Sequence, residues 1–209
     1  MPMNIVFDFG AVVFAWRPHE IVRGAFPQRA ATADAAGALA GAIFHHADWQ
    51  AFDRGTLEQS AVVQRTAHRL GLPHAAMQAL VSSIPQHLAP IPGTVDLLTR
   101  LRQRRDRDGD PRLYFLSNMP APYARELERR HAFLQWFDGG MFSADVKSIK
   151  PERDIFRMLE SRYALVPART VFIDDLPANV EAARAHGWHA IHFESALQLE
   201  PLLDEHVPR

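Results

Sequence analysis

Polar side chains that can carry out phosphoryl chemistry occur at separate points of the chain, most of them where a short apolar run ends. They are Asp8, Ser117, Lys150 and the acidic pair Asp174-Asp175. In an open parallel sheet, ligands bind outside the carboxyl ends of the strands. We therefore expect these side chains to converge, although they lie far apart in the sequence.

Each of these residue types has a part in phosphoryl transfer. The carboxylate of Asp8 can attack phosphorus and form an acyl phosphate. The acidic pair can hold Mg²⁺, a hard cation that prefers oxygen ligands. Ser117 and a Lys can bind the equatorial oxygens of the transferring phosphoryl group. Without a cation the nucleophile and the phosphate would repel each other, so the set predicts a magnesium-dependent reaction.

The elements that must position these residues follow from the apolar runs. Buried strands are expected over residues 3–7, 112–116, 170–173 and 188–193. Helical patterns separate them at residues 94–104, 122–131, 153–163 and 178–186. Strands that alternate with helices predict an α/β fold, a parallel sheet covered by helices on both faces.

Residues 15–90 break this alternation, because they hold no convincing strand. A capping box is expected at residues 56–59, opening a helix that Gly71 ends after Leu70. A second helix is expected from Pro73 towards His87. The prolines expected to mark the return linker are Pro85, Pro90 and Pro92. The segment therefore reads as a helical insertion after the first strand.

Composition excludes several classes of protein. The 209 residues carry a net charge of −1, which gives no general attraction to nucleic acid or an anionic membrane. The absence of Cys excludes a Cys nucleophile and thiolate metal sites. We expect no membrane span and no signal peptide, and hence a cytoplasmic protein of open oligomeric state. Only two of the 23 basic residues are Lys, namely Lys147 and Lys150.

Together these residues resemble the haloacid dehalogenase superfamily, whose four motifs occur in order along nearly the whole chain. The first is similar to residues 7–12, Phe-Asp-Phe-Gly-Ala-Val, and the second to residues 116–118, Leu-Ser-Asn. The third resembles Lys150-Pro151, and the fourth resembles residues 172–175 with Asn179. Response-regulator receivers use similar groups, but there the acidic pair comes first, whereas here it comes last.

The resemblance implies a Rossmann-like core of residues 1–14 and 91–209, with a helical cap domain over residues 15–90. It implies that Asp8 is the nucleophile and that Ser117, Asn118 and Lys150 bind the phosphate. It implies Mg²⁺ as cofactor, held by Asp8, the Gly10 backbone carbonyl and Asp175, with Asp174 outside the direct ligands or bound through water. The expected partner is a small phosphorylated metabolite, hydrolysed by a phosphatase.

One departure from the family pattern concerns the general acid. Most phosphatases of the superfamily carry a second Asp two residues after the nucleophile, and here that position is Gly10. A branch with this Asp-x-Gly pattern resembles glucose-1-phosphate phosphatases, which favours a sugar phosphate or similar phosphomonoester. His46, Trp49 and Asp53 are candidate cap contacts to the substrate, and Asp53 or His46 could replace the missing acid.

Two other functions stay open. One is a 2-haloacid dehalogenase, in which Asp8 attacks carbon without a metal. The other is a phosphate-binding regulatory module that Gly10 has made inactive. Lys147, by contrast with Lys150, has no assigned role.

Overall fold

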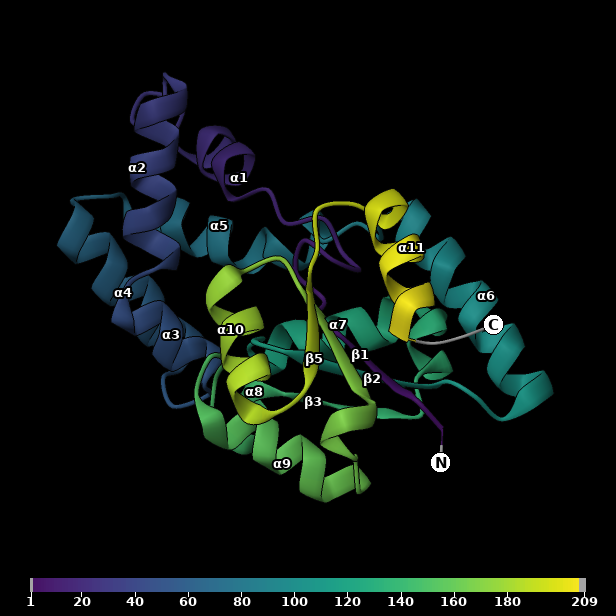
Figure 1. Cartoon of the computed structure of the whole chain (residues 1–209). Helices are drawn as coiled ribbons and strands as arrows, with labels where there is room; N and C mark the ends of the chain where they lie inside the picture. Colours follow the sequence, from purple (N-terminus) through teal and green to yellow (C-terminus); the bar gives the residue numbers. More distant parts are fainter. Residues whose placement is uncertain (1, 207–209) are drawn as a thin grey trace.

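A five-stranded parallel sheet forms the centre of the computed structural model, which describes residues 2–206 (Figure 1). The strands lie in the order β3-β2-β1-β4-β5, so β1 has β2 on one side and β4 on the other. Their bounds are β1 Asn4–Phe7, β2 Arg112–Ser117, β3 Gly139–Phe142, β4 Thr170–Asp174 and β5 His189–His192. The α/β fold with a parallel sheet is confirmed.

Helices cover both faces of this sheet. They are α6 Pro92–Asp108, α7 Ala121–Arg130, α8 Ser143–Val146, α9 Arg153–Tyr163, α10 Pro177–His186 and α11 Ala196–His206. Successive strand residues point to opposite faces, so Ile5 and Phe7 join the apolar cluster of α6 and α11. Val6 joins the cluster of α9 and α10. Figure 1 shows these two pairs of helices on opposite sides of the strands.

The insertion after β1 is helical, as the sequence predicts. It comprises α1 Pro18–Ala25, α2 Ala33–Phe44, α3 Ala47–Asp53, α4 Gln59–Leu70 and α5 His74–His87. We call residues 15–90 the helical insert. In Figure 1, α1 to α4 gather at one end of the molecule, and α5 leads back towards the sheet.

The chain enters and leaves the insert through two adjacent segments. The Ala15 N–H donates to the Ala89 carbonyl at 2.7 Å, and the Ile91 N–H donates to the Val13 carbonyl at 2.8 Å. One apolar cluster runs from the sheet into the insert, including Phe14. The division into a core domain (1–14 and 91–209) and a cap domain (15–90) stays a prediction.

Two details of the predicted insert are wrong. Helix α4 begins at Gln59 without a side-chain cap, because the Thr56 hydroxyl instead donates to the Ala51 carbonyl at 3.1 Å. Pro85 lies inside α5 and Pro92 is the first residue of α6, so neither lies in the return linker. Gly71 does end α4, in the left-handed conformation with φ of 59°. Among residues 2–206, none of the helices is long and apolar enough to cross a bilayer.

Strand β3 was not expected from the sequence, because it opens with Gly139-Gly140, a pair typical of turns. The structure explains the glycines. A Cβ atom on Gly139 would collide with the Tyr163 ring, and one on Gly140 would collide with the Phe115 ring. The Tyr163 hydroxyl also accepts a hydrogen bond from the Gly140 N–H at 3.0 Å. These glycines therefore leave room for two aromatic rings against an edge strand.

Candidate functional site

The carboxyl ends of three adjacent strands meet at one cavity, as the sequence predicts. Asp8 follows β1, Ser117 ends β2, and Asp174 ends β4 with Asp175 directly after it. Asp8, Ser117, Asp175 and Lys150 all line a cavity of about 320 Å³. Sheet order brings Asp8, Ser117 and Asp175 together, because β1 lies between β2 and β4. Lys150 comes instead from the segment between α8 and α9.

Asp8 is held at one carboxylate oxygen only. Its Oδ1 accepts from the Phe9 N–H at 2.7 Å and lies 2.8 Å from the Lys150 ammonium. Its Oδ2 has no hydrogen-bond partner within the described part of the chain. Burial raises the pKa of Asp8 to about 7; the charge of Lys150 opposes this shift, and those of Asp174 and Asp175 add to it. A bound cation would favour the ionised form that a nucleophile needs.

Lys150 lies between two carboxylates. Its ammonium is 2.6 Å from Asp174 Oδ2 and 5.3 Å from the centre of the Phe172 ring, and its side chain is 1% exposed. Burial, the largest influence, lowers its pKa, but the charges of Asp174 and Asp8 together raise the pKa of Lys150 above its ordinary value. The lysine therefore stays a cation beside Asp8.

Asn118 supports the Lys150 backbone. Its side-chain amide donates to the Lys150 carbonyl at 3.0 Å and accepts from the Lys150 N–H at 2.8 Å. The predicted phosphate contact of Asn118 stays a prediction, and its side chain joins the end of β2 to the lysine segment.

The two residues of the acidic pair differ in how many of their carboxylate oxygens bind other protein groups. Asp174 Oδ1 accepts from the Asn179 amide and the Leu176 N–H, both at 2.9 Å, and its Oδ2 faces Lys150. Among residues 2–206, no other residue donates a hydrogen bond to the carboxyl of Asp175, although its own backbone N–H does so and lowers its pKa. Burial, followed by the charge of Asp174, raises the pKa of Asp175 to about 6.

These carboxylates fit a divalent cation. Asp8, Asp174 and Asp175 each place one oxygen within 4.8 Å of the others, and such an all-oxygen set suits Mg²⁺. Because the oxygens of Asp174 are engaged by protein donors, Asp8 and Asp175 are the residues with an oxygen to offer. Gly10, whose carbonyl is the other predicted ligand, lines the same cavity.

The insert closes the cavity from the other side. Of the three candidate substrate contacts of the insert, Trp49 and Asp53 of α3 line the cavity, whereas His46 is not among its lining residues. The His46 ring instead caps α3, because its Nδ1 accepts from the Asp48 N–H at 3.1 Å. His45 lines the cavity instead of His46. The sequence alone does not show which of two neighbouring histidines faces a cavity.

Asp53 stands out among the lining residues of the insert. Its carboxyl has no hydrogen bond or ion pair to any of residues 2–206. Burial raises the pKa of Asp53 well above its ordinary value, and the charge of Asp8 adds to this shift. The carboxyl is thus held in an environment that favours its neutral form.

Sequence reasoning missed most of the cavity wall, which is apolar. The wall includes Trp16, Phe44, Ile84, Leu88, Met119 and Tyr123. In the sequence these apolar residues look the same as core residues, so no signal separates the two roles. It also missed His192, whose Nε2 lies 2.9 Å from the Asp175 carbonyl and steadies the loop after β4.

Two known phosphatases resemble this chain, one along almost its whole length and one along about half of it. The sesquiterpene phosphatase astK of Aspergillus oryzae is 27% identical over 192 residues, which cover 92% of this chain and 90% of the relative. A phosphorylated carbohydrates phosphatase of Thermotoga maritima is 29% identical over 101 residues, 48% of this chain and 44% of the relative.

Solved structures share the fold. A HAD family enzyme of Bacteroides thetaiotaomicron superposes with a TM-score of 0.72 at 17% identity, covering 97% of this chain and 98% of that one. The L-2-haloacid dehalogenase of Xanthobacter autotrophicus gives 0.68 at 17% identity, covering 100% of this chain and 85% of that one.

The family described as haloacid dehalogenase-like hydrolase matches residues 4–187. This match includes the strands that end at Asp8, Ser117 and Asp174. The chain therefore belongs to the haloacid dehalogenase-like hydrolases, and its curated relatives are named as phosphatases.

Proposed function

We propose that this hydrolase is a magnesium-dependent phosphatase that cleaves a small phosphomonoester through an aspartyl-phosphate on Asp8. The observation that carries the proposal is the position of Asp8. It shares one cavity with Lys150, Ser117 and Asp175, and one of its oxygens has no partner among the described residues.

The chain's own groups suit the two steps of such a reaction. Asp8 Oδ2 attacks phosphorus, the ester oxygen leaves with its electron pair, and a water molecule later attacks the phosphorus of the aspartyl-phosphate. Lys150 offers a positive charge and Ser117 a hydroxyl to the equatorial oxygens of the phosphoryl group, whose negative charge must be balanced during transfer. The backbone bonds from Asn118 hold the lysine segment in place during both steps.

A magnesium ion would reduce the repulsion between Asp8 and the phosphate. In this proposal Asp8, Asp175 and the Gly10 carbonyl hold it, and Asp174 orients Lys150 from outside the ligand set. One of the structural neighbours, the Bacteroides enzyme, has been solved with magnesium and inorganic phosphate, which supports the cofactor without assigning it here.

The walls of the cavity favour an apolar substrate. Aromatic and aliphatic side chains from both the insert and the core line it, with few polar groups beyond the phosphate site. A sugar would leave hydroxyl groups against apolar surface, and unpaired buried hydroxyls are costly. We therefore place phosphorylated apolar alcohols, such as terpenyl monophosphates, ahead of the sugar phosphates that the sequence favours. The named activity of the Aspergillus relative points the same way.

A phosphate-release panel tests the proposal. It compares a terpenyl monophosphate, a hexose 1-phosphate and a short alkyl phosphate, each with Mg²⁺ and with EDTA. We expect magnesium-dependent release with the terpenyl ester preferred, and no release by Asp8→Asn. Preference for the sugar phosphate would remove the substrate assignment alone. Ligand binding without turnover would favour the regulatory alternative, and EDTA-insensitive chloride release from 2-chloropropionate would favour the dehalogenase.

A further inference from the structure

The proposed reaction needs a proton donor that the strand ends do not supply. When the ester bond breaks, an alkoxide leaves unless a neighbouring acid protonates it. Gly10 has no side chain. In the proposed reaction Asp8 is the nucleophile, Asp174 is bonded to Lys150, and Asp175 binds the metal. The donor must therefore come from elsewhere on the cavity wall.

Few residues of the wall can act as an acid. The Tyr123 hydroxyl already donates to the Val81 carbonyl at 2.7 Å. His19 and His45 also line the cavity, from α1 and the end of α2, but no hydrogen bond or ion pair joins either of them to Asp8. Asp53 is a carboxyl that lines the cavity with Asp8, is close enough for their charges to interact, and has no bond to any described residue.

We propose that Asp53 of the insert is the general acid and base of this site, taking the place that Gly10 leaves empty. The inference rests on the proposed phosphatase function and adds a catalytic residue to it. The neutral form that burial favours for Asp53 is the form that can donate a proton.

The two steps balance with Asp53 in this role. As Asp8 Oδ2 bonds to phosphorus and the phosphorus–oxygen ester bond breaks, the ester oxygen takes the electron pair and the proton of Asp53. The alcohol leaves, and Asp53 is a carboxylate. In the second step that carboxylate takes a proton from the attacking water, the bond from phosphorus to Asp8 breaks, and phosphate leaves with Asp53 protonated again.

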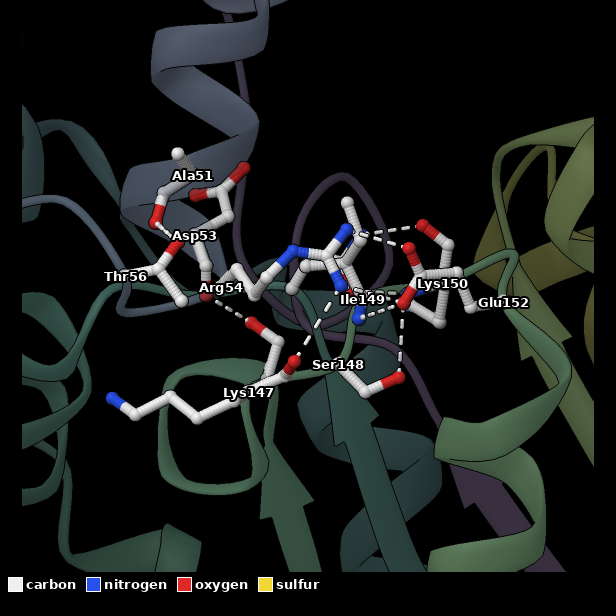
Figure 2. Close-up of polar contacts among 11 residues, drawn as sticks. Ala51, Asp53, Arg54, Thr56, Lys147, Ser148, Ile149, Lys150 and Glu152 are labelled. Atoms are coloured by element: carbon white, nitrogen blue, oxygen red, sulfur yellow. Dashed lines mark hydrogen bonds and ion pairs between the residues drawn. The ribbon is translucent and has the colours of Figure 1, made fainter.

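A catalytic group on an insert must be held accurately over the sheet, and three consecutive residues provide this. The Asp53 carbonyl accepts from the Ser143 hydroxyl at 2.5 Å. Arg54 binds Glu152 with two hydrogen bonds of 2.7 and 2.5 Å, and the Gly55 carbonyl accepts from the Lys147 ammonium at 2.7 Å. Figure 2 shows Arg54 extending from the insert to Glu152 and to the backbone of Lys147.

The same core segment also carries the lysine of the site. Glu152 is two residues from Lys150, and it accepts from the Ile149 N–H at 3.3 Å and the Ser148 hydroxyl at 3.1 Å. We call the contacts of residues 53–55 with 143–152 the insert clamp. Through it, Asp53 and Lys150 are positioned from one segment, which is what a shared active site requires.

The test uses the dependence of rate on the leaving group. Asp53→Asn keeps the shape of the side chain but removes the acid. The readout is kcat/KM, which covers the steps up to the departure of the alcohol and excludes the later attack of water. On an alkyl phosphate, whose alkoxide needs a proton, we expect kcat/KM to fall by about 10²–10⁴. On 4-nitrophenyl phosphate, whose phenolate leaves without one, we expect a loss of less than tenfold in kcat/KM.

The outcomes separate this inference from the function beneath it. Equal loss of kcat/KM on both substrates, or no loss on either, would overturn the role of Asp53 while wild-type turnover still supports the phosphatase. Loss of turnover on both substrates in Asp8→Asn, alongside selective loss in Asp53→Asn, supports both. A wild-type protein without phosphate release on any ester would overturn both together. Retained kcat/KM on 4-nitrophenyl phosphate would also show that Asp53→Asn is folded.

Discussion

The two lysines of this chain differ in what surrounds them. Lys150 is enclosed by Asp8, Asp174 and the Phe172 ring, a space that fits a compact ammonium. Lys147 is exposed, with its ammonium on the Gly55 carbonyl. The sequence left Lys147 without a role, and the structure places it in the insert clamp.

We expect Lys150→Arg to lower kcat by about 10², because a planar guanidinium cannot occupy the enclosed position with the same geometry. Lys147→Arg is the matched control, since a guanidinium can still donate to the Gly55 carbonyl. Steady-state phosphate release measures both. Equal activity of the two variants would remove the special role of Lys150.

Ala11 adopts a conformation that alanine disfavours. Its φ is +56°, in the left-handed region that costs L-residues with a Cβ roughly 1–2 kcal/mol. Asn tolerates this region better, so Ala11→Asn should raise the free energy of unfolding by about 0.5–1 kcal/mol. Urea denaturation measures this change. A variant of unchanged or lower stability would show that the turn after Asp8 is not strained at this residue.

The positions of the site residues were predictable from the sequence only where a strand end fixes them. Asp8, Ser117 and Asp175 were found in this way, because sheet order carries them to one edge. Asn118 and His46 were less predictable, because the direction of a loop side chain depends on neighbours far away in the sequence.

At the scale of elements, the insert clamp joins α3 to the segment between α8 and α9. Arg54 lowers the pKa of Glu152 from 4.5 to about 2, chiefly by its hydrogen bonds. A carboxyl whose pKa is lower in the folded than in the unfolded protein stabilises the fold at pH values above the unfolded-state pKa. This contribution is lost as the pH falls through the folded-state pKa.

We therefore expect the stability difference between wild type and Glu152→Gln to be full above pH 4.5 and to vanish towards pH 2. Both side chains are partly exposed, 29% for Arg54 and 42% for Glu152, so solvent screening limits the difference to below about 1 kcal/mol. Urea unfolding across this pH range measures it. The control is Glu128→Gln, an exposed residue on α7 without an ion pair to the described residues. A difference that stays constant with pH would contradict the linkage.

Elements with strong periodicity were predictable, and those shaped by close packing were not. Helix α9 has the bounds that the sequence gives it, Arg153–Tyr163. Strand β3 was not predicted, because its two glycines leave room for the rings of Phe115 and Tyr163. That requirement exists only after the sheet and α9 have packed together.

At the scale of the whole molecule, the fold divides the proposed reaction between two parts of the chain. The strand ends supply the proposed nucleophile and the acidic pair, and the segment between α8 and α9 supplies Lys150. The insert supplies much of the apolar wall and Asp53. If the acid comes from the insert, the loss of an Asp at Gly10 does not leave the protein inactive. A Cβ atom on Gly10 would have no neighbour within 4 Å, so the position has room for a side chain.

This space allows a rescue experiment. In the Asp53→Asn background, Gly10→Asp should restore turnover of an alkyl phosphate by tenfold or more, because it places a carboxyl two residues after the nucleophile. Gly10→Asn in the same background is the control, with the same size and no acid. Equal turnover of the two double variants would contradict the view that a missing acid limits the reaction.

The central claim is that Asp8 becomes phosphorylated, and this can be measured directly. Wild-type protein is mixed with a phosphomonoester and Mg²⁺, quenched in acid within a turnover, and reduced with borohydride, which converts an aspartyl-phosphate to homoserine. Peptide mass spectrometry should then find homoserine at position 8, and none when EDTA replaces Mg²⁺ or when the ester is omitted. Phosphate release with an unmodified Asp8, or with the modification at another carboxylate, would contradict the account.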